Sequence, residues 1–329
     1  MRKQIRILTP CISALLLVGI YLFRPDVAAT EQSLKNKNKL VADRACLEVN
    51  SYLQSDTGQR AHNQVLVRGG SFTMGHDNTY PEERPARPVA VDDFYIDTHE
   101  VTNAQFQAFV DATNYITTAE RQPDPALYPD IPADKLVPGS ASFIKLDDRP
   151  KGQWRNWWKF VEGASWRQPF GPGSDIEGMD NYPVVHVSYR DAKAYADWAG
   201  RELPSEAQWE FAAQASAKLK SANTWQGYFP MQDKGLDGFD GIAPVGCYDA
   251  DESGLFDMRG NVWEMVADEF EEPAGQIVPI KMRVIKGGSY LCADNFCQRD
   301  RPQARQGQEE DFSTDHVGFR TVSSVPANI

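Results

Sequence analysis

Two cysteines near the C-terminus, Cys292 and Cys297, lie five positions apart and follow a Gly-Gly-Ser sequence. Glycine accepts backbone conformations and close approaches that other residues do not, so the chain can bend sharply before the thiols. In an exported chain such a pair is most often a disulfide. Paired thiolates also suit soft metals such as Cu(I) or zinc. Two inert buried thiols are the third interpretation, and the spacing alone leaves all three open.

Two acidic loops precede the cysteines and could bind a hard cation. The first combines 223–225 with 237–241, and the second covers 257–264. Calcium takes six to eight oxygen ligands from carboxylates, amides and backbone carbonyls, and both loops contain such groups. Neither has the EF-hand spacing, and Asp, Asn and Gly clusters commonly form simple turns.

Composition excludes several classes of function. The chain has 329 residues and a net charge of −12, with no basic run or basic–aromatic stripe, so nucleic acid is not an expected partner. The sequence also lacks a Gly-x-Ser-x-Gly, a P-loop and a dinucleotide fingerprint. Its five histidines do not form a helical metal-binding pair, and His186, within an apolar segment, is expected to be a core residue.

The first 29 residues indicate export. Arg2, Lys3 and Arg6 precede an apolar run over 7–23, and Val27-Ala28-Ala29 resembles a cleavage site. We therefore predict a signal peptide over 1–29, or an uncleaved anchor, which is the only way in which the chain would contact a membrane. The body of the protein is expected in the periplasm, the secretory lumen or the medium.

Four cysteines remain once Cys11 of the leader is set aside, and in an oxidising compartment they allow three connectivities. Cys46 falls in a polar stretch, 30–62, that is predicted to be a tether with one weak helical segment over 39–52. Whether Cys46 pairs with Cys247 stays open. A globular domain is predicted over 63–325.

The globular part reads as an α+β domain with few helices and much irregular chain. Strands are expected over 65–67, over 71–75, at the end of 88–97, and over Pro183–Val187, and helices begin after the caps Thr102, Ser188 and Ser205. A stretch of about 70 residues without a period contains Trp154, Trp157, Trp158 and Trp166. These tryptophans are expected to fill the core.

Several motifs together resemble the formylglycine-generating enzymes, also called sulfatase-modifying factors, from Val65 to Val322. They are Arg68-Gly69-Gly70-Ser71-Phe72-Thr73-Met74-Gly75, Glu100-Val101-Thr102-Asn103, Pro183-Val184-Val185-His186-Val187-Ser188, Leu203-Pro204-Ser205-Glu206-Ala207-Gln208-Trp209-Glu210, Gly260-Asn261-Val262-Trp263-Glu264 and His316-Val317-Gly318-Phe319-Arg320. The resemblance implies a single compact domain related to the C-type lectin fold, low in regular secondary structure. The Gly-Gly-Ser-Tyr-Leu-Cys-x4-Cys sequence distinguishes the enzymes from relatives that share only the fold.

The resemblance implies a copper-dependent oxidase. Cys292 and Cys297 would hold Cu(I) as thiolates, and a cysteine of an unfolded or nascent sulfatase, in a Cys-x-Pro-x-Arg motif, would join them. Molecular oxygen would then convert that cysteine to Cα-formylglycine. Ser289 stands at the family's active-site serine and would position substrate or oxygen, although a turn-stabilising hydroxyl explains it equally well locally.

The resemblance also assigns two structural calcium sites. The first would use Asn223, the Thr224 carbonyl, Asp237 and the Phe239 carbonyl; the second would use Asp257, the Gly260 and Val262 carbonyls, and Glu264. The chain departs from the family pattern in two ways. Its loop before Asn223 is shorter, and it lacks the cysteines that cross-link the vertebrate members.

Two other functions stay open. One is a non-catalytic, lectin-like binding module in which Cys292 and Cys297 form a plain disulfide. The other is an oxidase of the iron sulfoxide synthase type on the same fold. That enzyme needs a histidine-bearing helical bundle before the domain, and 30–64 is too short to build one.

Overall fold

The computed structural model describes residues 46, 64–126, 128–129, 131–145, 157–271 and 281–325. Its centre is a four-stranded sheet in the order β11-β10-β9-β12, and a three-stranded antiparallel sheet has the order β1-β4-β13. The strands are β1 Gln64–Val67, β4 Phe94–Asp97, β9 Trp263–Glu269, β10 Met282–Lys286, β11 Arg305–Glu309, β12 Val317–Gly318 and β13 Val322–Ser324. In the central sheet β12 runs parallel to β9, and the other neighbours are antiparallel.

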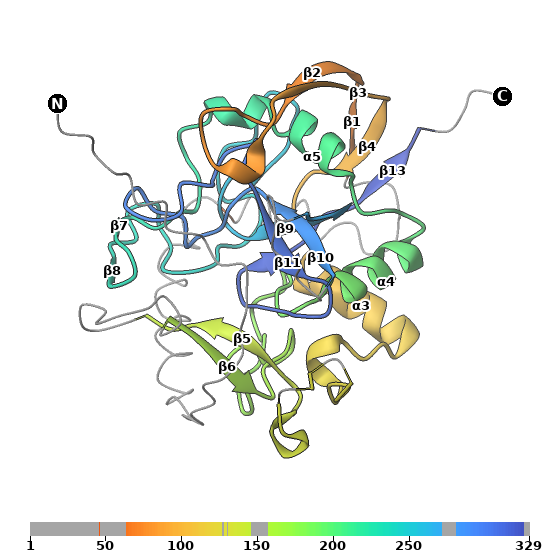
Figure 1. Ribbon diagram of the computed structural model, residues 1–329, viewed down its shortest axis with the longest axis vertical. Helices are drawn as coiled ribbons and strands as arrows, with labels where there is room; N and C mark the ends of the chain where they lie inside the picture. The colour runs from red at the N-terminus through yellow and green to blue at the C-terminus, as the bar shows by residue number, and fades with distance from the viewer. Residues whose placement is uncertain are drawn as a thin grey trace.

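Within the described ranges, the helices α3, α4 and α5 and three two-stranded antiparallel pairs surround these sheets (Figure 1). The helices are α3 Asn103–Thr113, α4 Tyr189–Ala199 and α5 Glu206–Ala212, with short 3-10 turns η1 Pro81–Glu83, η2 Thr118–Glu120, η3 Ala133–Lys135 and η5 Ala215–Lys218. The pairs are β2 Gly70–Met74 with β3 Arg87–Val91, β5 Gly139–Phe143 with β6 Trp158–Glu162, and β7 Gly227–Tyr228 with β8 Gln232–Asp233. The expected α+β class is confirmed.

The helices begin where the capping residues predict. Thr102, Ser188 and Ser205 each accept a hydrogen bond from the backbone of the third helical residue, which returns a side-chain bond to the cap. Such reciprocal caps satisfy backbone donors that a helix leaves unpaired at its start. Gly200 ends α4 in the left-handed conformation that glycine favours.

Both faces of the central sheet are buried, and the alternation of side chains along its strands explains how. Met265 of β9 and Ile285 of β10 pack with α3 and α4, whereas the adjacent Val266 and Val284 pack with α5 and the three-stranded sheet. Successive side chains of a strand point to opposite faces, so one strand contributes to two cores. The loop after β10 therefore starts from a firmly packed base.

The strand predicted at the end of 88–97 is confirmed as β4, and a further strand, β3, precedes it. One local expectation needs correction. The predicted strand over Pro183–Val187 is a single bridge at Pro183 followed by irregular chain, because His186 has a left-handed φ of 58° that interrupts the extended backbone. His186 is fully buried, as expected, and its Nδ1 contacts the Ser140 hydroxyl at 2.8 Å.

Cys46 and Cys247 form a disulfide. Cys46 is buried against Phe239 and Ala243, so the predicted tether is attached covalently to the domain at this position. The leader over 1–29 and the rest of the tether lie outside the described residues, as does Trp154. In the part of the chain that the structure describes, no helix has the length and apolar character needed to cross a bilayer.

Candidate active site and cation-binding loops

The loop after β10 turns sharply at two glycines. Gly287 and Gly288 have φ values of 91° and 77°, in the region where a side chain is strained. A Cβ on Gly288 would lie 2.8 Å from the Cα of Asp300, because the loop returns past its own beginning. The glycines therefore allow the two ends of the thiol-bearing loop to lie against each other.

Cys292 and Cys297 are brought together by this loop as reduced thiols. Their Sγ atoms lie 3.7 Å apart, without a disulfide. Two backbone hydrogen bonds between Ala293 and Phe296, of 2.8 and 3.0 Å, close the turn between them. Cys292 is buried and Cys297 is half-buried. The interpretation of the pair as a structural disulfide does not describe this structure.

The environment of the thiols holds Cys292 protonated in the absence of a metal. The hydrogen bond with the Cys297 thiol is the main cause that raises the pKa of Cys292 well above its ordinary value, and burial adds to it. Burial disfavours a thiolate unless a positive charge compensates it. A soft metal cation would supply that charge.

Ser289 supports the loop. It is buried, its carbonyl accepts a 2.9 Å hydrogen bond from the Cys292 amide, and its hydroxyl accepts one of 3.3 Å from the Leu291 amide. These contacts match a turn-stabilising hydroxyl. Its role in positioning substrate or oxygen stays a prediction.

An aromatic cluster that was not predicted as part of the site packs with Leu291 and Ala293 of the thiol-bearing loop. Phe229 stacks on Phe296, the neighbour of Cys297, with ring centroids 4.4 Å apart, and Trp157 meets both rings edge-on. The Asn295 side chain accepts a hydrogen bond from the Phe229 amide and donates one to the Phe229 carbonyl, each at 3.2 Å. The expected core role is confirmed for Trp157, which is buried in this cluster, and for Trp166, which is buried in the main core; Trp158 is partly buried against the cluster.

The four residues of the first predicted calcium set lie close together. Asp237 accepts hydrogen bonds from the backbone amides of Thr224, at 3.0 Å, and Phe239, at 3.3 Å. The neighbouring Asn223 is buried and donates its side-chain amide to the Gly241 carbonyl. Burial raises the pKa of Asp237 to about 6. A bound cation would favour the charged carboxylate in this partly desolvated loop.

The second predicted calcium set adjoins the first. The backbones of Gly260 and Asn223 pair in an isolated parallel β-bridge. They are so close that a Cβ on Gly260 would lie 2.1 Å from the Asn223 carbonyl oxygen. Asp257 is buried with a pKa raised to about 6, mainly by burial and also by the charge of Glu264. Glu264, however, already accepts hydrogen bonds from Arg320 and Trp209 on its two oxygens. Its carboxylate has a structural role in addition to the predicted one.

Glu100 belongs to the same buried acidic group and was not predicted as a ligand. It is fully buried, and its Oε1 accepts a 3.1 Å hydrogen bond from Asn261. Its Oε2 has no hydrogen-bond partner among the described residues. Burial raises its pKa well above the ordinary value, and the charges of Asp257 and Glu264 raise it further. An orphaned carboxylate oxygen here fits a bound cation.

Across the described ranges, no group of three or more His, Cys, Asp or Glu side chains is arranged to hold a metal ion. The calcium sets predicted here rely largely on carbonyl and amide oxygens.

Comparison with known proteins decides the family. The family model of the Sulfatase-modifying factor enzyme 1-like domain matches residues 50–325. This chain belongs to the sulfatase-modifying factor family. It is 44% identical to the formylglycine-generating enzyme of Mycobacterium tuberculosis, over 79% of this chain and 97% of the relative. It is 39% identical to the formylglycine-generating enzyme of Mus musculus, over 79% of this chain and 74% of the relative.

The family also contains members named as inactive. The chain is 38% identical to the inactive C-alpha-formylglycine-generating enzyme 2 of Bos taurus, over 83% of this chain and 92% of the relative. The solved structure of PvdO from Pseudomonas aeruginosa shares the fold, with a TM-score of 0.50, 22% identity, and coverage of 80% of this chain and 96% of that one. The fold is that of the formylglycine-generating enzymes, a C-type lectin-like α+β domain. Membership of the family alone therefore does not establish the activity of this chain.

Proposed function

We propose that this protein is a copper-dependent oxidase that converts a cysteine of sulfatases, in a Cys-x-Pro-x-Arg motif, to Cα-formylglycine with molecular oxygen. The observation that carries the proposal is the pair of reduced thiols of Cys292 and Cys297, 3.7 Å apart on the loop after β10. The names of its similar relatives support an enzyme that matures sulfatases.

The two thiols fit Cu(I). Thiolates are soft ligands that select monovalent copper, and both Sγ atoms lie close enough for one ion to contact them. When bound, copper would supply a soft Lewis-acidic centre for a substrate thiol and for oxygen. The half-buried Cys297 gives an incoming thiol access from solvent, while the buried Cys292 anchors the pair.

The chemistry balances with one additional reductant. Conversion of the substrate CH2–SH group and water to an aldehyde releases hydrogen sulfide and two electrons. Reduction of oxygen to water needs four electrons, so an external thiol pair would supply the other two and become a disulfide. The aromatic cluster of Trp157, Phe229 and Phe296 packs with Leu291 and Ala293, and it would limit water on that side of the thiol-bearing loop.

We further propose that the protein works outside the cytosol. The Cys46–Cys247 disulfide suits an oxidising compartment and agrees with the predicted leader. Unfolded or nascent sulfatases would meet the enzyme there.

The proposed calcium ions would stabilise the irregular loops on both sides of Asn223. The support is the electrostatic proximity of the buried carboxylates of Glu100, Asp257 and Glu264, on all of which the positive charge of Arg320 acts. These side chains do not form a metal cluster by themselves, so the predicted carbonyl oxygens would have to complete the site. The Oε2 of Glu100, which has no hydrogen-bond partner in the part of the chain that the structure describes, adds a further oxygen for the second ion.

The test is conversion of a peptide containing Cys-x-Pro-x-Arg by the copper-loaded protein in air with a thiol reductant. Mass spectrometry should find the peptide with its CH2–SH group replaced by CHO. A matched peptide with serine at the cysteine position should stay unchanged. If neither this peptide nor a natural sulfatase peptide reacts, the oxidase proposal fails and the non-catalytic binding module is the remaining interpretation.

A further inference from the structure

The two thiols are held in place by different parts of the molecule. Cys292 is fixed through its own backbone: its amide donates to the Ser289 carbonyl at 2.9 Å, and its carbonyl accepts from the Trp225 amide at 2.8 Å. Cys297 has a left-handed φ of 50°. For a residue with a Cβ this conformation costs roughly 1–2 kcal/mol. The neighbouring structure must therefore stabilise it.

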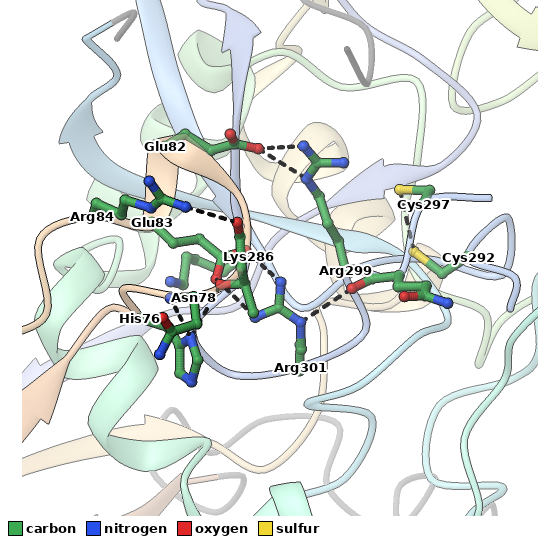
Figure 2. A network of polar contacts seen from close by, with 12 residues as sticks. His76, Asn78, Glu82, Glu83, Arg84, Lys286, Cys292, Cys297, Arg299 and Arg301 are labelled. Atoms are coloured by element: carbon green, nitrogen blue, oxygen red, sulfur yellow. Dashed lines mark hydrogen bonds and ion pairs between the residues drawn. The ribbon is translucent and has the colours of Figure 1, made fainter. Parts of the chain in front are cut away.

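The Cys297 side chain packs against the main core, and Arg299, two residues later, anchors the chain that follows it. The Arg299 amide donates a 2.8 Å hydrogen bond to the Cys297 carbonyl, which closes a tight turn. Its side chain is only 3% exposed and contacts Glu82 through two nitrogens, with the Nε–Oε1 distance at 3.1 Å. The guanidinium also lies over the ring of Tyr80, 3.6 Å from the centroid. Figure 2 shows Glu82, Arg299 and the thiols in one network.

The partner segment lies far away in the sequence, 217 residues before Arg299, in the 3-10 turn η1. A second pair strengthens the contact, because Arg301 binds both carboxylate oxygens of the buried Glu83. The backbone carbonyl of Glu82 accepts a 3.2 Å hydrogen bond from Arg305. The chain after Cys297 is therefore attached by three arginines to one short turn.

A planar guanidinium held by a carboxylate and an aromatic face has one orientation, which an ammonium group would not have. That orientation fixes the Arg299 backbone and, through the tight turn, the Cys297 carbonyl and Cα. We propose that Glu82, Arg299 and Tyr80 are positioning residues that keep the Cys297 thiol facing Cys292. The inference rests on the proposed copper-dependent function for its purpose, but the geometry of the thiols can be measured without copper.

The experiment compares the wild type with Glu82→Gln, Arg299→Lys and the double variant in two measurements. The first is Cu(I) affinity, by competition with a chelator. The second is the fraction of Cys292–Cys297 disulfide in glutathione buffers without metal, which reports how closely the thiols are held. We expect each single change to weaken Cu(I) binding about tenfold, because a buried charge-assisted contact is lost. We also expect each to lower the disulfide equilibrium constant by a similar factor.

Arg283 supplies a matched control. Its Nη2 and Nε lie 3.0 and 3.1 Å from Glu310 Oε2, and its guanidinium lies 4.1 Å from the centroid of the Tyr189 ring. This is the same combination of a carboxylate and an aromatic face, near the start of β10 rather than on the loop that follows it. Arg283→Lys should lower the melting temperature as much as Arg299→Lys while leaving both thiol measurements unchanged. In both thiol measurements the double variant should differ from the wild type by no more than either single variant does, because both changes remove the same contact between Arg299 and Glu82.

If Arg299→Lys and Glu82→Gln change the thiol measurements no more than Arg283→Lys does, the positioning role is wrong. If the wild type binds no copper but the disulfide equilibrium shifts as expected, the positioning role stands and the proposed function fails.

Discussion

Arg320 contacts Glu264 at two points in the fully buried centre of the domain, with Nε–Oε2 and Nη2–Oε1 distances of 2.6 and 2.7 Å. Trp209 donates its indole N–H to the same carboxylate at 2.7 Å. The pair joins β9 to the C-terminal segment and to α5, so it ties both cores to the loops that carry the predicted cation ligands.

Breaking this pair should destabilise the fold strongly. Replacing Arg320 by Met leaves a buried carboxylate without its cation, and we expect a loss of about 3–5 kcal/mol in the free energy of unfolding. Urea unfolding of the variant and the wild type measures this loss. The control is Lys193→Gln, which removes an exposed pair with Asp197 and should cost under about 0.5 kcal/mol. Equal losses in the two variants would contradict the role of Arg320.

The Cys46–Cys247 disulfide should add stability by restricting the unfolded chain. Its cysteines are separated by 201 residues, and a long closed loop of this kind typically contributes about 2–4 kcal/mol. Cys46→Ser with Cys247→Ser should therefore lower the denaturation midpoint. Alkylation of the unreduced, denatured wild type should label Cys292 and Cys297 and leave Cys46 and Cys247 protected. Labelling of Cys46 and Cys247 would show that the pair does not form.

Removal of calcium should lower the melting temperature by several degrees, since an ion bound only by the native state stabilises it. Asp237→Asn should reduce the response to a chelator. Glu252→Gln changes an exposed acid in the same half of the chain and should leave the response intact. A melting temperature that is indifferent to chelator in the wild type would contradict both calcium sites.

Asp315 predicts a specific pH dependence of stability. Burial raises its pKa from 3.8 to about 7, so the folded state holds this proton more tightly than the unfolded chain. The associated loss of stability begins as pH rises above about 4 and is complete above about 7. Asp315→Asn keeps an acceptor for the Phe143 amide and removes the titration. Relative to wild type, the free energy of unfolding of this variant, measured in urea, should be larger by about 3 kcal/mol more at pH 8 than at pH 5. Identical pH profiles would show that Asp315 does not titrate this way.

The sequence predicted the local structure best where one short-range interaction dominates. The caps at Thr102, Ser188 and Ser205 depend on residues three positions apart, and all three form. The strand expected at His186 failed because the left-handed backbone there is imposed by packing against distant chain, including the hydrogen bond between the His186 amide and Thr314. A local pattern contains no information on that contact.

The candidate site was predictable in its chemistry but not in its supports. Cys292 and Cys297 were evident from their types and spacing, whereas their state as thiols was not. The contact of Arg299 with Glu82 spans 217 residues, and no local pattern connects η1 to the thiol loop. The Oε2 of Glu100 has no hydrogen-bond partner among the described residues, and its surroundings emerge only when Glu100 meets Asp257 and Glu264, more than 150 residues later, in the core.

The most direct measurement is the rate of conversion of the Cys-x-Pro-x-Arg peptide, as kcat/KM, for copper-loaded wild type, Cys292→Ser and Cys297→Ser. Conversion by wild type alone, lost in both serine variants while their folds stay intact by circular dichroism, is the predicted result. Conversion that persists without either thiol, or that is absent from the copper-loaded wild type, would contradict the account.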